Sequence, residues 1–308
     1  KIPVGQKFIV SGTDVHHLTE ELEGCLSVDH LKSNHDEADT RLLLHAADIL
    51  KSVELAVIRT VDTDVLVMAL HHFHDMVESQ STQDVVMNIG TGNHRRYISI
   101  GQLCRSMPEG VRVNILAAYA LTGCDTTNAL FRITKAKAVT TLEGEEYHLE
   151  TLGDPKDPLS EACEKECKRY IARLYGDFDE LTEARYKIYA SKVTKNESAL
   201  PPSENAAKYH IQRAAFQTLV WKRALTAQIT EMPSPLEYGW NAEGIPIQCD
   251  RSPVHDQILI TCNCKTTQCI KRSCKCFKID LKCTDACMCK GCENHSEISI
   301  ETDDGSDD

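Results

Sequence analysis

The sequence predicts an α/β fold followed by a helical region and a small cysteine-rich module. The first observation is an apolar run at 56–58 that leads through Val61-Asp62-Thr63-Asp64 into a second apolar run at 65–70. This pattern is typical of a buried parallel strand that feeds a turn and then a helix or second strand. The second is a strand–turn–strand pattern over residues 84–100. The third is a set of nine cysteines between residues 262 and 292, among fifteen in the chain.

The composition limits the classes of protein that fit this chain. Its 308 residues are enough for about two domains. The formal net charge of -12 argues against a general coating of nucleic acid, so any contact with DNA must come from a local patch or through bound cations. The clustered cysteines favour a metal-binding module in a reduced, intracellular protein over a secreted disulfide scaffold.

The sequence also carries information on location. It has no visible signal peptide and no apolar run that approaches about 18 residues, so we expect neither secretion nor a membrane span. We expect a nuclear location instead. The first residue is Lys1 rather than Met, so we expect the chain to be the rear part of a longer polypeptide.

The first elements are short. Residues 7–10 predict a strand, 11–14 a turn and 16–26 a helix. The next helix is expected to begin at Ser33 or Asn34 as N-cap, with acids in its first turn, where the helix dipole favours negative charge. The apolar positions that recur at helical spacing, and that we expect to pack on the sheet, are Ala38, Leu42, Ala46, Ile49 and Val53.

Acidic residues occur at three separated places along the first part of the chain. Asp62 and Asp64 follow the predicted strand, at the edge where open α/β sheets bind ligands, and they repel each other unless a cation or hydrogen bonds compensate. Alternatively, one of them only caps the following helix. Asp125 comes just after an apolar helix that stops at Gly123, and it is either a turn residue or a further acid at the same place. The five candidate acids are Glu37, Asp39, Asp62, Asp64 and Asp125.

Residues 141–250 are expected to be a linker and a helical extension. The stretch 141–160 is acidic and punctuated by Pro and Gly, so it predicts a linker or long surface loop. Helical patterns follow at 161–175 and 178–193, in which Cys163 and Cys167 share a face and are interpreted as packing residues rather than half a zinc site. A further helix after Ser203 has an apolar seam, and 233–250 predicts an irregular or hairpin segment. The seam consists of Ala207, Ile211, Ala214, Thr218, Trp221 and Leu225.

The most specific motif is the cysteine-rich module, residues 262–294. Three tetrahedral Zn2+ ions need twelve ligand positions, and nine thiolates supply twelve if three of them bridge; two ions with eight terminal thiolates are the alternative. An odd number of cysteines disfavours a disulfide cage. With few apolar residues, the module must take most of its folding free energy from the metal. Its predicted ligands are Cys262, Cys264, Cys269, Cys274, Cys276, Cys283, Cys287, Cys289 and Cys292.

Basic residues suggest where nucleic acid would be bound. The module has seven Lys or Arg residues against three acids, which is enough for modest, salt-sensitive contact with phosphates. The acidic tail, 295–308, is expected to be disordered. The candidate nucleic-acid contacts in the module are Lys265, Lys271, Arg272 and Lys275.

The order of the acidic motifs resembles that of flap endonucleases and other PIN-like nucleases over roughly residues 1–140. The resemblance implies an N-terminally incomplete PIN-like sandwich with a central, mostly parallel sheet. It also implies that Glu37 and Asp39 would serve one Mg2+ or Mn2+ ion, and that Asp62, Asp64 and Asp125 would serve a second. Two such ions about 4 Å apart can hydrolyse a phosphodiester bond. Two features depart from the family. Nothing before His35 resembles the family's first strand, which ends in a further metal-binding Asp, and residues 131–138 replace a glycine-rich turn that contacts the phosphate backbone. Arg132, Lys135 and Lys137 keep positive charge at this place, so the resemblance makes them candidate nucleic-acid contacts.

The rear module is similar to the tesmin-type CXC domain at every cysteine spacing, including Phe277 and Asn294. Family members that bind DNA insert a Tyr that precedes the fourth cysteine and usually carry two copies, whereas here Ser273 stands in a single copy. Because every cysteine spacing is kept, we expect the module to bind zinc. Because the Tyr is replaced and only one copy is present, we do not expect it to read a DNA sequence. The whole arrangement also resembles a group of uncharacterised, mobile-element-related proteins.

Two functions remain open on the sequence alone. The first is a metal-dependent nuclease, tethered to DNA by the zinc cluster. The second is a catalytically inactive PIN-like scaffold that acts as a zinc-stabilised DNA- or chromatin-binding adaptor.

Overall fold

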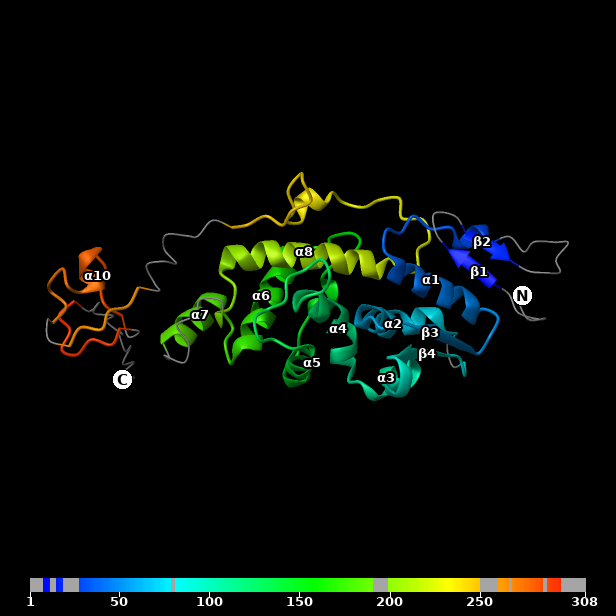
Figure 1. Ribbon diagram of the computed structural model, residues 1–308, viewed down its shortest axis with the longest axis horizontal. Coiled ribbons are helices and arrows are strands. Elements are labelled where there is room, and N and C mark those ends of the chain that lie inside the picture. The colour runs from blue at the N-terminus through cyan, green and yellow to red at the C-terminus, as the bar shows by residue number, and fades with distance from the viewer. Residues whose placement is uncertain are drawn as a thin grey trace, which may run out of the picture.

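The computed structural model describes residues 8–11, 15–18, 28–78, 81–190, 199–249, 260–265, 268–284 and 287–294. The fold is mixed α/β and mostly helical, with a small three-stranded sheet and a separate two-stranded one among the described residues (Figure 1). The α-helices are α1 (Ala38–Leu50), α2 (Thr63–Met76), α3 (Ile100–Ser106), α4 (Glu109–Leu121), α5 (Lys135–Gly144), α6 (Glu161–Tyr175), α7 (Leu181–Ala190), α8 (Glu204–Lys222) and α10 (Lys275–Lys278). The strands are β1 (Phe8–Ser11), β2 (Val15–Leu18), β3 (Leu55–Arg59), β4 (Asp84–Ile89) and β5 (Arg96–Ser99).

The main sheet has the order β3-β4-β5. β3 and β4 pair in parallel, whereas β4 and β5 pair antiparallel, so the expectation of a mostly parallel central sheet is wrong for the described residues. The reason lies in the connections: α2 provides the crossover from β3 to β4, and the short segment 90–95 can only return the chain as an antiparallel strand. That segment confirms the strand–turn–strand prediction for 84–100.

The described N-terminal residues form a separate antiparallel hairpin of β1 and β2. The strand predicted at 7–10 corresponds to β1. The helix predicted from residue 16 is wrong for 15–18, which are β2, and its remainder lies outside the described residues.

Strand β3 is buried on one face only. Ala56 and Ile58 are 3% and 5% exposed, whereas Leu55 and Val57 are 53% and 55% exposed. The prediction of a buried parallel strand is therefore correct in direction but wrong for one face, because burial alternates along β3 and only the face that bears Ala56 and Ile58 is covered. A continuous apolar run does not distinguish a strand covered on both faces from one covered on a single face.

Helix α1 begins later than predicted and presents a different face. Its N-cap is Glu37. Asn34 instead donates from Nδ2 to the Ile229 carbonyl oxygen at 2.7 Å and accepts from the Ile229 N–H at 2.9 Å, so its side chain is used to hold a distant segment. The buried side chains are Thr40, Leu43, Leu44, Ala46 and Leu50, whereas Leu42, Ile49 and Val53 of the expected face are exposed.

Helix α8 is the element on which the helical region is assembled. It contacts α2, α4 and α6 along its length (Figure 1). The predicted seam is confirmed, because its residues from Ala207 to Trp221 are buried, and Ser203 caps the helix by accepting from the Ala206 N–H. Helix α6 matches the predicted 161–175, and Cys163 and Cys167 are both buried in the main core, as packing predicts.

The stretch 141–160 was expected to be a linker or surface loop, but much of it is packed. Tyr147, Leu149 and Leu152 belong to the main core. Asn114 of α4 accepts from the Leu149 N–H at 2.6 Å and donates to the Tyr147 carbonyl oxygen at 2.9 Å, so a buried amide anchors the segment. One continuous core therefore includes residues from Leu43 to Ala224.

Candidate functional site

Asp62 and Asp64 lie at the start of α2, which follows β3 directly. Asp62 is the N-cap, and its Oδ1 accepts from the Asp64 N–H at 2.9 Å. The helix-capping alternative is therefore confirmed for Asp62. Capping uses only one of its carboxylate oxygens, and Asp64 stands half-buried in the first turn of the helix.

Asp125 lies on a closed turn just after α4. Gly123 has φ +109, and a Cβ added there would meet the Ala129 backbone at 2.6 Å, so the chain requires glycine where the helix ends. Cys124 and Thr127 then exchange two backbone hydrogen bonds of 3.1 and 3.2 Å. Asp125 is exposed within this turn.

The three acidic places lie close enough to influence one another. Burial raises the pKa of Glu37 and of Asp39 above their usual values, and the charge of Asp125 raises both further. Burial also raises the pKa of Asp64 to about 6, with the charges of Asp62 and Asp125 adding to the effect. The fold therefore creates a region of negative potential from three separated motifs.

The acids do not, however, match the geometry of a single-ion site. In the described part of the chain, the groups whose metal-ligating atoms all lie within 4.8 Å of one another consist of cysteines only. Carboxylate oxygens suit hard cations such as Mg2+ and Mn2+, but the spacing of these five acids is wider than one coordination sphere.

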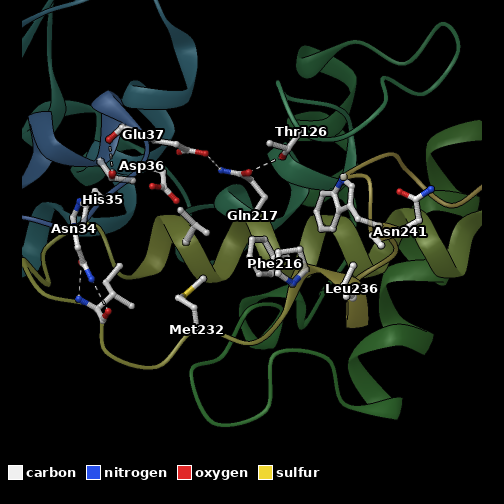
Figure 2. A pocket seen from close by; sticks show the side chains of 17 residues that line it. Asn34, His35, Asp36, Glu37, Thr126, Phe216, Gln217, Met232, Leu236 and Asn241 are labelled. Carbon is white, nitrogen blue, oxygen red and sulfur yellow. Dashed lines mark hydrogen bonds between the residues drawn. The ribbon is translucent and has the colours of Figure 1, made fainter. Parts of the chain in front are cut away.

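A buried glutamine joins two of the acidic motifs (Figure 2). Gln217 of α8 donates from Nε2 to Oε1 of Glu37 at 2.9 Å, and its Oε1 accepts from the Thr126 hydroxyl at 2.6 Å. The side chain of Gln217 is 3% exposed. Sequence analysis missed this residue, because Gln217 is not one of the apolar seam residues and nothing in the sequence of α8 shows that its amide is buried against an acid.

Lys135, one of the candidate nucleic-acid contacts, is bound to the end of α4. Its Nζ donates to the Tyr119 carbonyl oxygen at 2.7 Å, to the Thr122 hydroxyl at 3.2 Å and to the Gly123 carbonyl oxygen. It therefore satisfies the carbonyl groups at the end of α4. Burial lowers its pKa to about 8, although the negative charge of Asp64 acts in the opposite direction. Arg132 and Lys137 are exposed.

Eight of the nine cysteines of the module form three overlapping groups of four. Cys283 belongs to all three groups, and Cys262 and Cys269 each belong to two. The groups are Cys262, Cys269, Cys274 and Cys283; Cys262, Cys276, Cys283 and Cys287; and Cys269, Cys283, Cys289 and Cys292.

The sulfur spacings fit zinc–thiolate tetrahedra. Sγ of Cys262 lies 3.7 Å from Sγ of both Cys269 and Cys283, and Sγ of Cys276 lies 3.6 Å from Sγ of Cys287. A Zn–S bond of about 2.3 Å gives a tetrahedron edge of about 3.8 Å, whereas a disulfide would bring the sulfurs to about 2.05 Å. The cysteines of the module are free thiols at the spacing that a shared metal cluster needs.

Cys264 is the ninth cysteine and stands outside the three groups. It packs against the buried cysteines of the module, and it lines a pocket with Ser273 and Lys275, the two sequence neighbours of Cys274. If Cys264 replaces Cys283 in the first group, each of the three ions takes two shared and two terminal sulfurs. Cys262, Cys269 and Cys283 are then the bridging residues, and nine thiolates fill all twelve positions.

The three central cysteines are poor thiolates without a cation. Burial raises the pKa of Cys262, Cys269 and Cys283 well above the usual value for a thiol. Zn2+ ions would remove this penalty by binding the deprotonated sulfurs directly. The donor set therefore fits a structural zinc cluster.

The peptide around the cluster is closed by backbone hydrogen bonds. The Met288 N–H donates to the Cys262 carbonyl oxygen at 2.8 Å, and the Cys283 N–H donates to the Asn294 carbonyl oxygen at 2.6 Å. Asn294, 7% exposed, donates from Nδ2 to the Leu281 carbonyl oxygen at 2.8 Å. These hydrogen bonds tie Cys262, at the start of the module, to Met288. They tie Asn294, at its end, to Leu281 and Cys283.

The outer surface of the module carries positive charge. All four predicted phosphate-contact residues are exposed: Lys265, Lys271, Arg272 and Lys275. Ser273 is exposed between them, and Phe277 is 42% exposed on α10. The acidic tail at 295–308 lies outside the described residues.

Comparisons with known proteins identify the module. The family model for the tesmin/TSO1-like CXC domain, a cysteine-rich domain, matches residues 259–296. Protein tesmin/TSO1-like CXC 8 of Arabidopsis thaliana is 42% identical over 52 residues, which are 16% of this chain and 14% of that protein. Protein lin-54 of Caenorhabditis elegans is 48% identical over 33 residues, 11% of this chain and 8% of that protein. The chain thus spans only a small part of these curated relatives.

No solved structure matches the chain. No helix in the described residues is both long and apolar enough to cross a membrane. The agreement of the cysteine spacing, the clustered sulfurs and the family match shows that the rear of this chain carries a tesmin/TSO1-like CXC domain.

Proposed function

We propose that this protein is a nuclear, DNA- or chromatin-associated adaptor whose CXC domain contacts DNA through a three-zinc cluster. The observation that carries the proposal is the set of three overlapping four-sulfur groups, surrounded by exposed Lys and Arg side chains. The cluster folds the module around metal and displays its basic residues outward, although the whole chain has a net charge of -12.

The mode of DNA contact follows from these residues. Lys265, Lys271, Arg272 and Lys275 supply phosphate contacts, which position a protein on DNA without reading its sequence. Ser273 has neither the aromatic ring nor the length to act as a wedge between bases. Binding is therefore expected to be salt-sensitive and to show little preference among duplex sequences.

The experiment is a titration of the full chain with labelled duplex DNA at several salt concentrations. Lys271→Ala and Arg272→Ala are each expected to reduce the slope of log K against log salt by about 0.9. Lys208→Ala, an exposed lysine on α8, is the matched control and should leave the slope unchanged. Absence of DNA binding, or equal slopes in all variants, would reject the proposal.

A second candidate function is a Mg2+- or Mn2+-dependent nuclease. The favouring observation is that the charge of Asp125 raises the pKa of acids in both of the other motifs. These acids are Glu37 and Asp39 in the first motif and Asp64 in the second. This candidate assumes a PIN-like acid core in a protein related to mobile elements. The order of the acidic motifs along the chain supports the PIN-like core. When bound, the ions would supply the activated water and the stabilisation of the leaving oxygen.

The test of this candidate is cleavage of branched and single-stranded DNA with Mg2+ or Mn2+. Cleavage that is lost in Asp64→Asn would establish the nuclease. Absence of cleavage by the unmodified chain, with DNA binding intact, would leave the adaptor as the function.

A further inference from the structure

A cavity of about 520 Å³ lies next to the acidic motifs and shares Glu37 with them. It is bounded by α8, by the segment that leads into α1 and by residues 229–244, which run back along α8 (Figure 2). Its apolar lining comes from Phe216, Val220, Ile229, Met232, Pro235, Leu236 and Trp240, and its polar lining includes Asn34, Asp36, Glu37, Thr126, Gln217 and Asn241.

The aromatic wall of the cavity is rigidly built. The rings of Phe216 and Trp240 meet edge to face, with centroids 5.5 Å apart and planes at 70°. Gly239 has φ +84, and a Cβ there would meet the Tyr209 carbonyl oxygen at 2.9 Å, so the turn before Trp240 lies directly on α8. The Ile247 N–H donates to the Gly239 carbonyl oxygen at 2.9 Å, which closes this turn. Trp240 is therefore held in place before any ligand arrives.

The charge of the cavity has one sign. Asp36 and Glu37 line it, and no Lys or Arg is among the described residues that do. The charges of Asp39 and Asp125 also act on Glu37 from just outside. An anionic ligand would meet this potential unfavourably, and a purely apolar one would cover the carboxylates without pairing them.

We propose that this cavity binds a Lys or Arg side chain of a basic peptide, with the charged head at Asp36 and Glu37 and the alkyl stem against Trp240 and Phe216. In this pose the charged head gains charge-assisted hydrogen bonds to the carboxylates, and the alkyl stem buries apolar surface against the two rings. The neighbouring apolar groups, Met232 and Leu236, accept an apolar residue next to it. The partner is thus a protein with an exposed basic segment.

The experiment measures binding of an acetylated and amidated hexapeptide of alternating leucine and lysine to the full chain by calorimetry. Asp36→Asn and Trp240→Ala are each expected to weaken binding about tenfold. Leu236→Lys should weaken it similarly and is not expected to disturb folding, because Leu236 is 54% exposed. Glu237→Gln is the matched control: it removes an exposed charge from the same segment but from outside the cavity, and binding should not change.

Three results would overturn the proposal. One is the absence of peptide binding. Another is equal weakening by Asp36→Asn and Glu237→Gln, which would mean attraction by the net charge alone. The third is a thymidine hexanucleotide that binds in a Trp240-dependent manner and displaces the peptide, which would make the cavity a site for nucleic acid.

Discussion

Gln217 donates a hydrogen bond to Glu37 across 2.9 Å, although the two residues are 180 positions apart in the chain. The same amide accepts from the Thr126 hydroxyl, so one side chain of α8 holds the first acidic motif to the turn that bears the third. Neither acid motif alone determines where its carboxylates lie, because their positions depend on a helix that comes much later in the sequence.

Replacement of this amide should reduce stability. Gln217→Leu leaves Glu37 and Thr126 without their buried partner, which is expected to lower the free energy of unfolding by about 1–3 kcal/mol. Gln217→Glu should cost more, because it adds a negative charge beside Glu37. Urea denaturation measures both, with Gln212→Leu on the same helix as the control. Equal midpoints for Gln217→Leu and the control would show that the bridge contributes nothing.

The capping role of Asp62 can be separated from its charge. Asp62→Ala removes the acceptor for the Asp64 N–H and should lower the free energy of unfolding by about 1 kcal/mol. Asp62→Asn keeps a capping oxygen and removes the repulsion with Asp64, so it should retain stability. Thermal melts of the two variants give the comparison. A loss of the same size in both would contradict the cap.

The two glycines near α4 have opposite expected effects. Gly123→Ala requires a left-handed backbone and a contact with Ala129 at 2.6 Å, so it should destabilise the chain by about 1–3 kcal/mol. Gly110→Ala lies within α4 with nothing inside 4 Å of the added Cβ and should stabilise by about 0.5–1 kcal/mol. If alanine were tolerated equally at both positions, the end of α4 would not depend on Gly123.

The stability of the chain should depend on pH through His71. Burial lowers the pKa of His71 from 6.5 to about 3, so between these values the unfolded chain binds a proton that the folded chain does not. The contribution of His71 to the free energy of unfolding is therefore fully present above pH 6.5 and is lost as the pH falls toward 3. His71→Gln should flatten this part of the profile of unfolding free energy against pH. An unchanged slope in the variant would exclude His71 as the cause.

The features that the sequence predicted well are those that local chemistry determines. The end of α4 follows from Gly123, the start of α2 from Asp62, and the sulfur cluster from cysteine spacing that only a shared metal explains. The features it did not predict depend on long-range packing. The exposed face of β3, the buried face of α1 and the roles of Gln217 and Lys135 are decided by distant elements.

The zinc content of the purified chain tests the central claim most directly. Elemental analysis should find three Zn2+ ions per chain, because nine thiolates with Cys262, Cys269 and Cys283 shared supply twelve ligand positions. Chelation should remove them together and unfold residues 262–294, while the helices of the main core remain. A value of two would contradict the bridged cluster, and a value of zero would remove the metal-folded module on which the proposed function depends.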